Sequence, residues 1–308
     1  MTKVFIDGGA GTTGLRIVER LSDREDLTLL TLSEEKRKLP EERKKAIDQA
    51  DIVFLCLPDE AARQAVSLCE NPDTVILDTS TAHRTDPAWA YGFPELSPAH
   101  EEKIKTAKRI AVPGCHASGF IALVYPLVKA GLLPREALLS CFSLTGYSGG
   151  GKKMIAEYEA ASRDGLLGAP RQYGLAQNHK HLPEMTAITG LTSAPAFCPV
   201  VADFYSGMEV TVPLFADQIG GTTEDIRNLY RRHYTGPMVR YAEEPFENGF
   251  AAANKLAGRD DMEIAVAGGE ERLLLIARYD NLGKGASGAA IECMNLALGT
   301  DPTTGLAI

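Results

Sequence analysis

Cys115 has the sequence surroundings of a nucleophile. It lies in VPGCHASG, residues 112–119, where an apolar strand-like run gives way to a helical one. The N–H groups and the dipole at the start of a helix stabilise a thiolate, which is the nucleophilic form of cysteine. The glycines on both sides leave room for a substrate. The pattern predicts a cysteine that attacks a carbonyl carbon and holds the acyl group as a thioester.

Two histidines, His179 and His181, are candidates for the acid–base partner of this cysteine. They lie in NHKHLPE, residues 178–184, within a stretch from 164 to 196 that is rich in Gly, Pro, Gln, Asn and His. Zinc binding is a competing interpretation, but no third ligand is nearby in the sequence and Cys115 is isolated. We therefore favour a Cys–His pair and expect no metal. The sequence leaves open which of the two imidazoles exchanges the proton.

A glycine-rich turn near the N-terminus predicts a dinucleotide site. Residues 8–14 read GGAGTTG, and Gly9, Gly11 and Gly14 satisfy Gly-x-Gly-x-x-Gly. Such a turn lets backbone N–H groups at a helix start approach a pyrophosphate closely. The turn follows an apolar strand and opens a helix, which is the context that the fingerprint requires.

The residues after the second strand-like run bear on the choice between NAD and NADP. An acidic residue there would bind the ribose 2′-hydroxyl of NAD. This chain has Ser33, which can hydrogen-bond a 2′-phosphate, and Lys36 or Arg37 can neutralise that phosphate. Glu34 and Glu35 oppose this interpretation, and the run is also compatible with a solvated charged surface. We expect NADP.

The elements that must position these residues form two patterns. In the first third of the chain, short apolar runs such as Ile52–Leu57 alternate with helical patterns, which is typical of a doubly wound parallel sheet. Later runs such as Met208–Phe215 are longer and alternate in polarity, which favours an antiparallel sheet. A last apolar helix over 286–298 needs a partner for its apolar face.

We expect an α/β protein with two domains. A Rossmann-type doubly wound parallel sheet would bind NADP and comprise residues 1–114 with 285–308. An α+β catalytic and oligomerisation domain with a mainly antiparallel sheet would comprise residues 115–284. Ligand sites of open α/β sheets lie outside the carboxyl ends of the strands, so Cys115 should lie at the boundary of the two domains.

Composition and charge disfavour several classes of partner. The 308 residues carry a formal net charge of −9, which argues against nucleic acid. No apolar run is long enough to span a bilayer, and residues 1–6 run into a strand without a signal-peptide core. The cysteines other than Cys115 lie in apolar runs or on helix faces, without Cys-x-x-Cys spacing, which is typical of buried thiols in a reducing compartment. We expect a cytoplasmic protein.

Taken together, these features resemble the semialdehyde dehydrogenase superfamily, and within it the short form of the N-acetyl-γ-glutamyl-phosphate reductases. The similarity covers almost the whole chain in the family's order, and its PGC and HxHxPE segments are specific even singly. The matching segments are GGAGTTG (8–14), LCLP (55–58), LDTSTAHR (77–84), YGFPEL (91–96), PGC (113–115), TGYSGGGK (145–152), HKHLPE (179–184) and DNLGKGA (280–286).

Two positions depart from the long form of the family. The long form has an aromatic residue after the cysteine and a threonine two positions later, whereas this chain has His116, Ala117 and Ser118 there. His83 stands where the long form has phenylalanine. Both departures resemble the short form, and they bear on substrate details rather than on the chemistry.

The resemblance implies a reaction and a set of site residues. Cys115 would attack a γ-acyl phosphate, NADPH would reduce the thioester, and His179 or His181 would protonate the resulting oxygen. The enzyme would be a dimer or a tetramer. The implied cofactor-binding residues are Gly9, Gly11, Thr12, Thr13, Gly14, Ser33, Arg37, Cys56, Pro58, Ser148, Gly149 and Asn281. The implied substrate-binding residues are Ser80, Arg84, Lys152 and Glu184, and the fork of Arg84 suits a carboxylate or a phosphate.

Two kinds of alternative remain at this point. One is a related acyl-phosphate reductase, either an aspartate-semialdehyde dehydrogenase or an enzyme for an aminoadipate derivative. Residues 91–95 (YGFPE) and 179–181 (HKH) favour the glutamyl enzyme over the aspartyl one. The other is a non-catalytic NADP-sensing protein with the same fold, against which the presence of Cys115 with the histidine pair argues.

Overall fold

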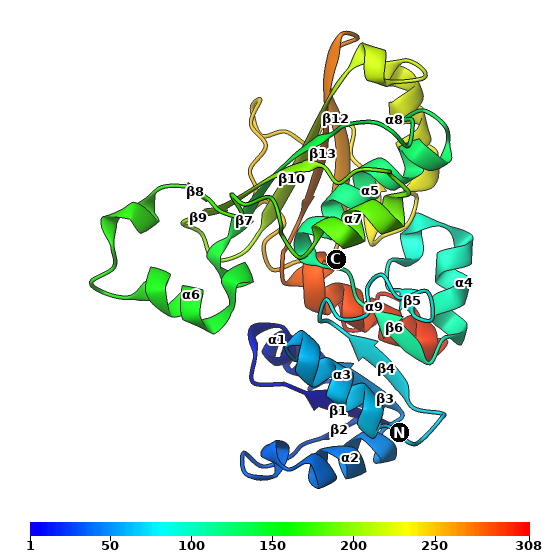
Figure 1. Ribbon diagram of the computed structural model, residues 1–308, viewed down its shortest axis with the longest axis vertical. Helices are drawn as coiled ribbons and strands as arrows, with labels where there is room; N and C mark the ends of the chain where they lie inside the picture. The colour runs from blue at the N-terminus through cyan, green and yellow to red at the C-terminus, as the bar shows by residue number, and fades with distance from the viewer. The chain divides into compact units, whose positions relative to one another are not determined.

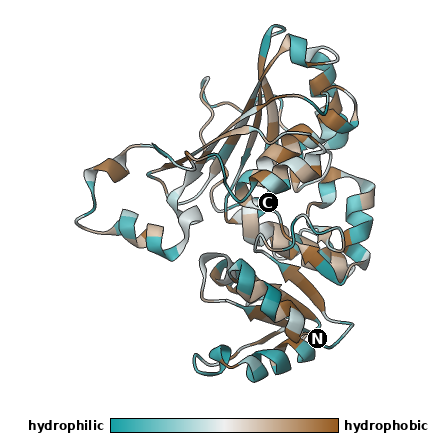
Figure 2. Ribbon diagram, in the orientation of Figure 1, coloured by the Kyte–Doolittle hydropathy of each residue, from teal (hydrophilic) through white to brown (hydrophobic).

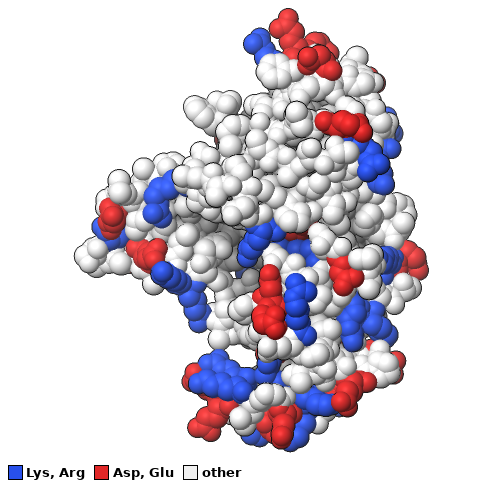
Figure 3. All heavy atoms as spheres, viewed as in Figure 1, with Lys and Arg blue, Asp and Glu red and all other residues white.

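The computed structural model describes residues Met1–Ile308, which divide into two compact units (Figure 1). Unit 1 consists of Met1–Gly114 and Ala286–Leu306, and unit 2 of Cys115–Gly285 with Ala307–Ile308. None of the helices combines the length and apolar character needed to span a bilayer. On the face drawn in Figure 3, acidic and basic side chains are interspersed.

Unit 1 is built on a parallel sheet with the strand order β2-β1-β3-β4-β6-β5. The connection after β1 therefore leads to one side of it, where β2 lies, and β3 lies on the other side. Ligands of open α/β sheets bind beside such a switch in strand order. Every residue of β3 and β4 is buried, as in central strands covered on both faces. The strands are β1 Thr2–Asp7, β2 Leu27–Leu30, β3 Ile52–Leu55, β4 Val75–Asp78, β5 Ala90–Tyr91 and β6 Arg109–Ala111.

Helices cover both faces of this sheet, each over its own apolar cluster. On one face, α2 and α3 contribute residues such as Ile47 and Ala62. On the other face, α1, α4 and α9 contribute Ile17, Ile104 and Ile291 among others. The C-terminal helix α9 thus lies in the same core as the first strand. The helices are α1 Thr12–Leu21, α2 Pro40–Gln49, α3 Asp59–Leu68, α4 Pro98–Thr106 and α9 Gly288–Ala297.

Unit 2 is built on a mixed sheet with the strand order β11-β12-β13-β10-β7-β9-β8. Its central pairs are antiparallel, whereas β11 pairs with β12 and β7 with β9 in parallel. A parallel pair needs a long crossover, which residues 147–195 provide between β7 and β9. The strands are β7 Ser140–Gly146, β8 Arg171–Gln172, β9 Ala196–Ala202, β10 Met208–Phe215, β11 Val239–Tyr241, β12 Met262–Gly268 and β13 Arg272–Tyr279.

The helices of unit 2 are α5 Cys115–Lys129, α6 Gly151–Glu159, α7 Leu182–Thr189 and α8 Thr223–His233. Helix α5 packs on β10 and β13 and also contacts α7 and α8. All residues from His116 to Leu127 are buried, so this helix is apolar on every side rather than amphipathic. Figure 2 shows hydrophobic colour concentrated in the strands, whereas the outer helix α2 is mostly hydrophilic.

The expected fold class, a Rossmann-type sheet with a second α+β part, is confirmed. The stretch 164–196, expected to be irregular, contains β8 and the helix α7. The helices α4, α6 and α8 and the strands β5, β9 and β11 were not expected either. The final helix is shorter than expected and begins at Gly288.

Candidate active site

Cys115 is the first residue of α5, and a tyrosine from the neighbouring strand fixes its backbone. The hydroxyl of Tyr279, the last residue of β13, donates to the carbonyl of Cys115 (2.5 Å) and accepts from the N–H of Gly119 (3.0 Å). An ordinary α-helix would join these two backbone groups directly. A Cβ at position 119 would lie 2.7 Å from the Tyr279 oxygen, so only glycine leaves room for the bridge.

A third histidine joins the predicted pair. The ring of His116, next to the nucleophile, lies 5.6 Å from the rings of both His179 and His181, which are 4.8 Å from each other. Its Nδ1 is 2.6 Å from the Ser143 hydroxyl and its Nε2 is 2.6 Å from the Tyr173 hydroxyl. Because hydroxyls occupy both ring nitrogens, His116 has no site for a metal. No group of three or more His, Cys, Asp or Glu side chains is arranged to hold one.

Burial controls the protonation of these imidazoles. Burial, with His179 and Lys180 as neighbouring charges, lowers the pKa of His116 to about 3, so this ring is neutral at physiological pH. Burial and Lys180 also lower the pKa of His179. The Nδ1 of His179 accepts a hydrogen bond from the backbone N–H of His181 (3.2 Å), so a neutral His179 ring carries its proton on Nε2.

Tyr173 lies within electrostatic reach of the nucleophile. Burial is the main cause that raises the pKa of its phenol, and the charge of Cys115 raises it further. The phenol therefore stays protonated beside a thiolate. The ring of Tyr173 also meets the ring of His179 edge to face, with centroids 6.1 Å apart. Cys115, the three histidines and Tyr173 thus form one cluster within unit 2.

Sequence reasoning did not single out Tyr173, Ser143 or Tyr279 as site residues. Tyr173 lies six residues before His179 in the stretch whose composition was noticed, so its aromatic ring among Gly, Gln and Asn was an available signal. Ser143 and Tyr279 are single positions in ordinary strand patterns, and only the pairing of strands brings them to α5.

Three of the predicted cofactor-binding residues come together elsewhere in unit 2. The buried Asn281 side chain donates to the hydroxyl of Ser148 (3.0 Å) and accepts from the N–H of Gly207 (2.9 Å). Gly149 lies beside this amide, since a Cβ there would be 3.4 Å from its nitrogen. The N–H groups of Gly146, Tyr147 and Ser148 donate to the carbonyls of residues 207, 204 and 205, respectively, which fixes the turn.

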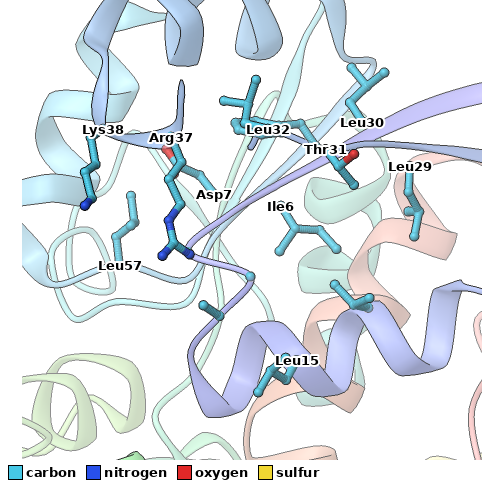
Figure 4. A pocket seen from close by; sticks show the side chains of 15 residues that line it. Ile6, Asp7, Leu15, Leu29, Leu30, Thr31, Leu32, Arg37, Lys38 and Leu57 are labelled. Atoms are coloured by element: carbon cyan, nitrogen blue, oxygen red, sulfur yellow. The ribbon is translucent and has the colours of Figure 1, made fainter. Parts of the chain in front are cut away.

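The glycine turn of unit 1 borders a cleft of about 620 Å³ (Figure 4). Gly8 has φ +88°, and a Cβ there would lie 2.2 Å from the carbonyl oxygen of Cys56. Gly11 precedes α1, whose first residues are Thr12 and Thr13. The lining residues are Phe5, Ile6, Asp7, Gly8, Gly9, Ala10, Leu15, Val18, Leu29, Leu30, Thr31, Leu32, Arg37, Lys38 and Leu57.

Two predicted residues flank this cleft at the carboxyl end of β3. The backbone N–H of Cys56 donates to the carbonyl of Asp7 (2.8 Å). Burial raises the pKa of Cys56 to about 12, so this thiol is not a nucleophile. Pro58 is the residue before α3. The Asp7 carboxylate, which lines the cleft at the end of β1, is held by Arg43 (2.6 Å).

The charged segment after β2 provides two basic side chains to the same cleft. Arg37 lines the cleft and also pairs with Glu34 (2.5 Å), and Lys38 lines it as well. Lys36 pairs instead with Glu42 (3.2 Å). Ser33 does not line the cleft, and its hydroxyl accepts from the N–H of Lys36 (3.3 Å). The basic face of the cleft therefore consists of Arg37 and Lys38.

The four residues predicted to bind substrate fall in both units. In unit 1, the Ser80 hydroxyl donates to the buried carboxylate of Asp78 (2.8 Å), and the Arg84 guanidinium donates to the Val112 carbonyl (2.9 Å). In unit 2, Lys152 is exposed in the first turn of α6. Glu184 is buried in the first turn of α7, which contacts α5.

Family profiles match most of the chain. Residues 3–106 match the semialdehyde dehydrogenase NAD binding domain, and residues 115–281 match the semialdehyde dehydrogenase dimerisation domain. The chain belongs to the semialdehyde dehydrogenase family. The resemblance inferred from the sequence is thereby confirmed, and the glycine cleft belongs to an NAD(P)-binding domain of that family.

Curated relatives narrow the position within the family. The N-acetyl-gamma-glutamyl-phosphate reductase of Brucella anthropi is 46% identical, over 96% of this chain and 98% of that protein. N-acetyl-gamma-glutamyl-phosphate reductase 2 of Pseudomonas putida is 44% identical, over 96% of each chain. The corresponding Nostoc protein is 41% identical over 99% of each. Within the semialdehyde dehydrogenases, this chain groups with these reductases.

Solved structures of the family share the fold. Aspartate semialdehyde dehydrogenase II of Vibrio cholerae, complexed with ASA, superposes with a TM-score of 0.73 at 17% identity, over 97% of this chain and 98% of that one. The aspartate semialdehyde dehydrogenase of Candida albicans with NADP gives 0.65 at 14% identity, over 96% and 99%. At such identities the likeness concerns the fold alone.

Proposed function

We propose that this protein reduces N-acetyl-γ-glutamyl phosphate to N-acetylglutamate semialdehyde and phosphate with NADPH, a step of arginine biosynthesis in the cytoplasm. The observation that carries the proposal is the cluster of Cys115 with His116, His179 and His181 at the start of α5. It occurs in a chain that is 46% identical to an N-acetyl-gamma-glutamyl-phosphate reductase over nearly its full length.

Cys115 carries the acyl group through the reaction. Its thiolate forms a bond to the γ-carbonyl carbon, and the carbon–oxygen bond to phosphate breaks, which leaves a thioester and inorganic phosphate. When NADPH is bound, its nicotinamide would supply a hydride to this carbonyl. An imidazolium from His179 or His181 then gives a proton to the oxygen of the hemithioacetal. The same histidine takes this proton back as the carbon–sulfur bond breaks, so that the carbonyl re-forms, the Cys115 thiolate is restored and the aldehyde leaves.

Several features of this chain fit NADP. The turn at residues 8–14 presents N–H groups at the start of α1, which suits a pyrophosphate. Arg37 and Lys38 supply positive charge to the cleft, which suits a 2′-phosphate. The residues that we assign to the cofactor are Gly9, Gly11, Thr12, Thr13, Gly14, Ser33, Arg37, Cys56, Pro58, Ser148, Gly149 and Asn281.

We assign the substrate to Ser80, Arg84, Lys152 and Glu184. A guanidinium and an ammonium suit the carboxylate and the phosphate of an acyl phosphate. The names of the relatives favour the glutamyl substrate over the aspartyl one.

The outer face of the unit 2 sheet supports a homo-oligomer, a dimer or a tetramer. Helix α5 packs against one face of β10 and β13, and apolar side chains stand exposed on strands of this sheet. Phe142 is 51% exposed and Leu274 is 40% exposed. This unit matches a dimerisation domain. Analytical ultracentrifugation at micromolar concentration tests the assignment, and a single monomeric species would contradict it.

The reverse reaction tests the function with stable reagents. The protein is incubated with NADP, inorganic phosphate and one of a panel of semialdehydes, and NADPH formation is followed by absorbance. We expect phosphate-dependent reduction of NADP with N-acetylglutamate semialdehyde and little with aspartate semialdehyde. Preference for an aspartyl or aminoadipyl aldehyde would reassign the substrate. Absence of turnover with every aldehyde would favour a non-catalytic NADP-binding protein.

A further inference from the structure

His116 joins three separate parts of unit 2. It belongs to the first turn of α5, its Nδ1 meets the hydroxyl of Ser143 in β7, and its Nε2 meets the hydroxyl of Tyr173 just after β8. Both contacts are 2.6 Å. The ring is also flanked by Phe197 of β9, with centroids 5.4 Å apart. Every polar atom of this buried ring therefore has a fixed partner.

The segment that carries the other two histidines has little regular structure of its own. Its backbone is tied to β9, where the Gln177 amide bonds both the N–H (2.8 Å) and the carbonyl (2.7 Å) of Phe197. The N–H of Tyr173 bonds the carbonyl of Pro199 (3.0 Å). These bonds fix the course of the chain. The His179 ring is also held at its Nδ1 by the backbone N–H of His181 (3.2 Å).

The rings of His179 and His181 also both pack against His116. The His179 ring lies perpendicular to the His116 ring, at 86° and 5.6 Å, and meets Phe197 at 5.1 Å. The His181 ring lies 5.6 Å from His116 on a tilted plane. A ring held at both nitrogens cannot rotate, so it forms a fixed surface against which the neighbouring rings pack. Proton transfer depends steeply on such orientation.

We propose that His116 is a positioning residue, fixed by Ser143 and Tyr173, that orients the rings of His179 and His181 toward the acyl group on Cys115. The inference rests on the proposed function, because it assigns these rings to its acid–base step. In this role His116 exchanges no proton itself. Its role depends on its hydrogen bonds to the two hydroxyls, whereas His179 or His181 exchanges the proton.

Three variants test the role of these bonds. His116→Phe keeps a ring and removes both nitrogens, Tyr173→Phe removes one hydroxyl, and His116→Gln keeps a donor and an acceptor on one side chain. We expect kcat to fall about 10- to 100-fold in His116→Phe and less in Tyr173→Phe, with KM for the semialdehyde unchanged. His116→Gln should recover part of the loss. The double variant His116→Phe with Tyr173→Phe should have the same kcat as His116→Phe alone, because both changes break the same hydrogen bond.

Histidine ring titration by NMR supplies a readout that does not depend on turnover. The chain has only six histidines, so the signals can be assigned by substitution. The groups that face His179 are Lys180, His181, Tyr173 and His116, and burial lowers its pKa. We expect the pKa of His179 to rise toward 6.5 in His116→Phe, as the ring loosens into solvent.

Tyr158→Phe is the matched control. The hydroxyl of Tyr158, in α6, accepts from Arg171 of β8 (3.0 Å). This bond lies outside the cluster, so the variant should keep both kcat and the titration curves. Unchanged kcat and unchanged titration in His116→Phe would overturn the proposal, as would an equal loss in Tyr158→Phe. If the wild type turned over no aldehyde, the proposed function would fail, and the titration curves would still decide whether His116 orients its neighbours.

Discussion

The hydroxyl of Tyr279 stands inside the first turn of α5, between the carbonyl of Cys115 and the N–H of Gly119. It takes the place of a backbone hydrogen bond at the turn that presents the nucleophile. Burial and the Cys115 charge raise the pKa of this phenol well above its usual range, so it remains a donor when the thiol ionises. The geometry of the nucleophile therefore depends on a strand about 160 residues away in sequence.

Tyr279→Phe should lower kcat about tenfold or more, with NADPH affinity unchanged, because the turn that carries Cys115 loses its bridge. It should also lower the free energy of unfolding by about 1–3 kcal/mol, since two buried backbone groups lose a partner. Steady-state kinetics and urea unfolding measure the two effects. Tyr230→Phe is the control, since its hydroxyl bonds the carbonyl of Leu123 (2.5 Å) farther along the same helix. A similar loss of kcat in both variants would mean that the Tyr279 hydroxyl contributes to the stability of the helix and not to the geometry of Cys115.

Cys115→Ser should abolish turnover and leave NADPH binding nearly intact. The cysteine and the glycine turn serve different tasks, and serine offers no comparable anion at neutral pH. We expect a loss of at least about 1,000-fold in kcat, with the cofactor Kd from fluorescence titration within about twofold of the wild type. Cys293→Ser, at a buried thiol in the core of unit 1, should lower Tm rather than kcat. Near-normal turnover in Cys115→Ser would exclude a thioester.

Features of the site could be predicted from the sequence where the residues that form them lie within a few positions of one another. The glycine turn, Cys115 and the His179–His181 pair are recognisable because each requires its residue types within a few positions. The bonds of His116 with Ser143 and Tyr173, and of Tyr279 with Cys115, join elements 27, 57 and 164 residues apart. Contacts between positions so far apart leave no local pattern in the sequence, so these bonds could not be predicted from it.

The missed helix α7 had local signals that composition obscured. Pro183 lies in its first turn, and Gly190 ends it with φ +78°. Proline near the start and glycine after the end are ordinary helix boundaries. The helix has only eight residues, and the polar segment before it contains no periodic pattern. By contrast, helix α5 was expected, because its apolar run is long and continuous.

The cofactor preference should depend on the basic residues of the unit 1 cleft. Arg37→Ala with Lys38→Ala should raise the Kd for NADPH about 10- to 100-fold and leave the Kd for NADH nearly unchanged, because only NADPH carries a 2′-phosphate. Isothermal titration with both cofactors measures this difference. Lys36→Ala is the control, since Lys36 pairs with Glu42 and does not line the cleft. Equal weakening of both cofactors would identify the pair as a general charged surface.

Acid should destabilise the fold through His116. The pKa of its ring is about 3 in the folded state against an ordinary value of 6.5, so below pH 6.5 the unfolded chain takes up a proton that the folded chain refuses. Stability is therefore fully present above pH 6.5 and is lost as pH falls toward 3, by up to about 1.4 kcal/mol per pH unit for this one proton. Burial of His179 acts in the same direction.

His116→Phe should remove this contribution, so that its free energy of unfolding falls less steeply with acid than that of the wild type. Urea unfolding at several pH values between about 4.5 and 7.5 measures the slopes. Tyr173→Phe keeps the imidazole and loses one hydrogen bond, so its curve should lie below the wild-type curve and run nearly parallel to it. Identical slopes in His116→Phe and the wild type would mean that the His116 ring accepts a proton in the folded protein. In that case, the buried ring would not be neutral between its two hydroxyl partners at acidic pH.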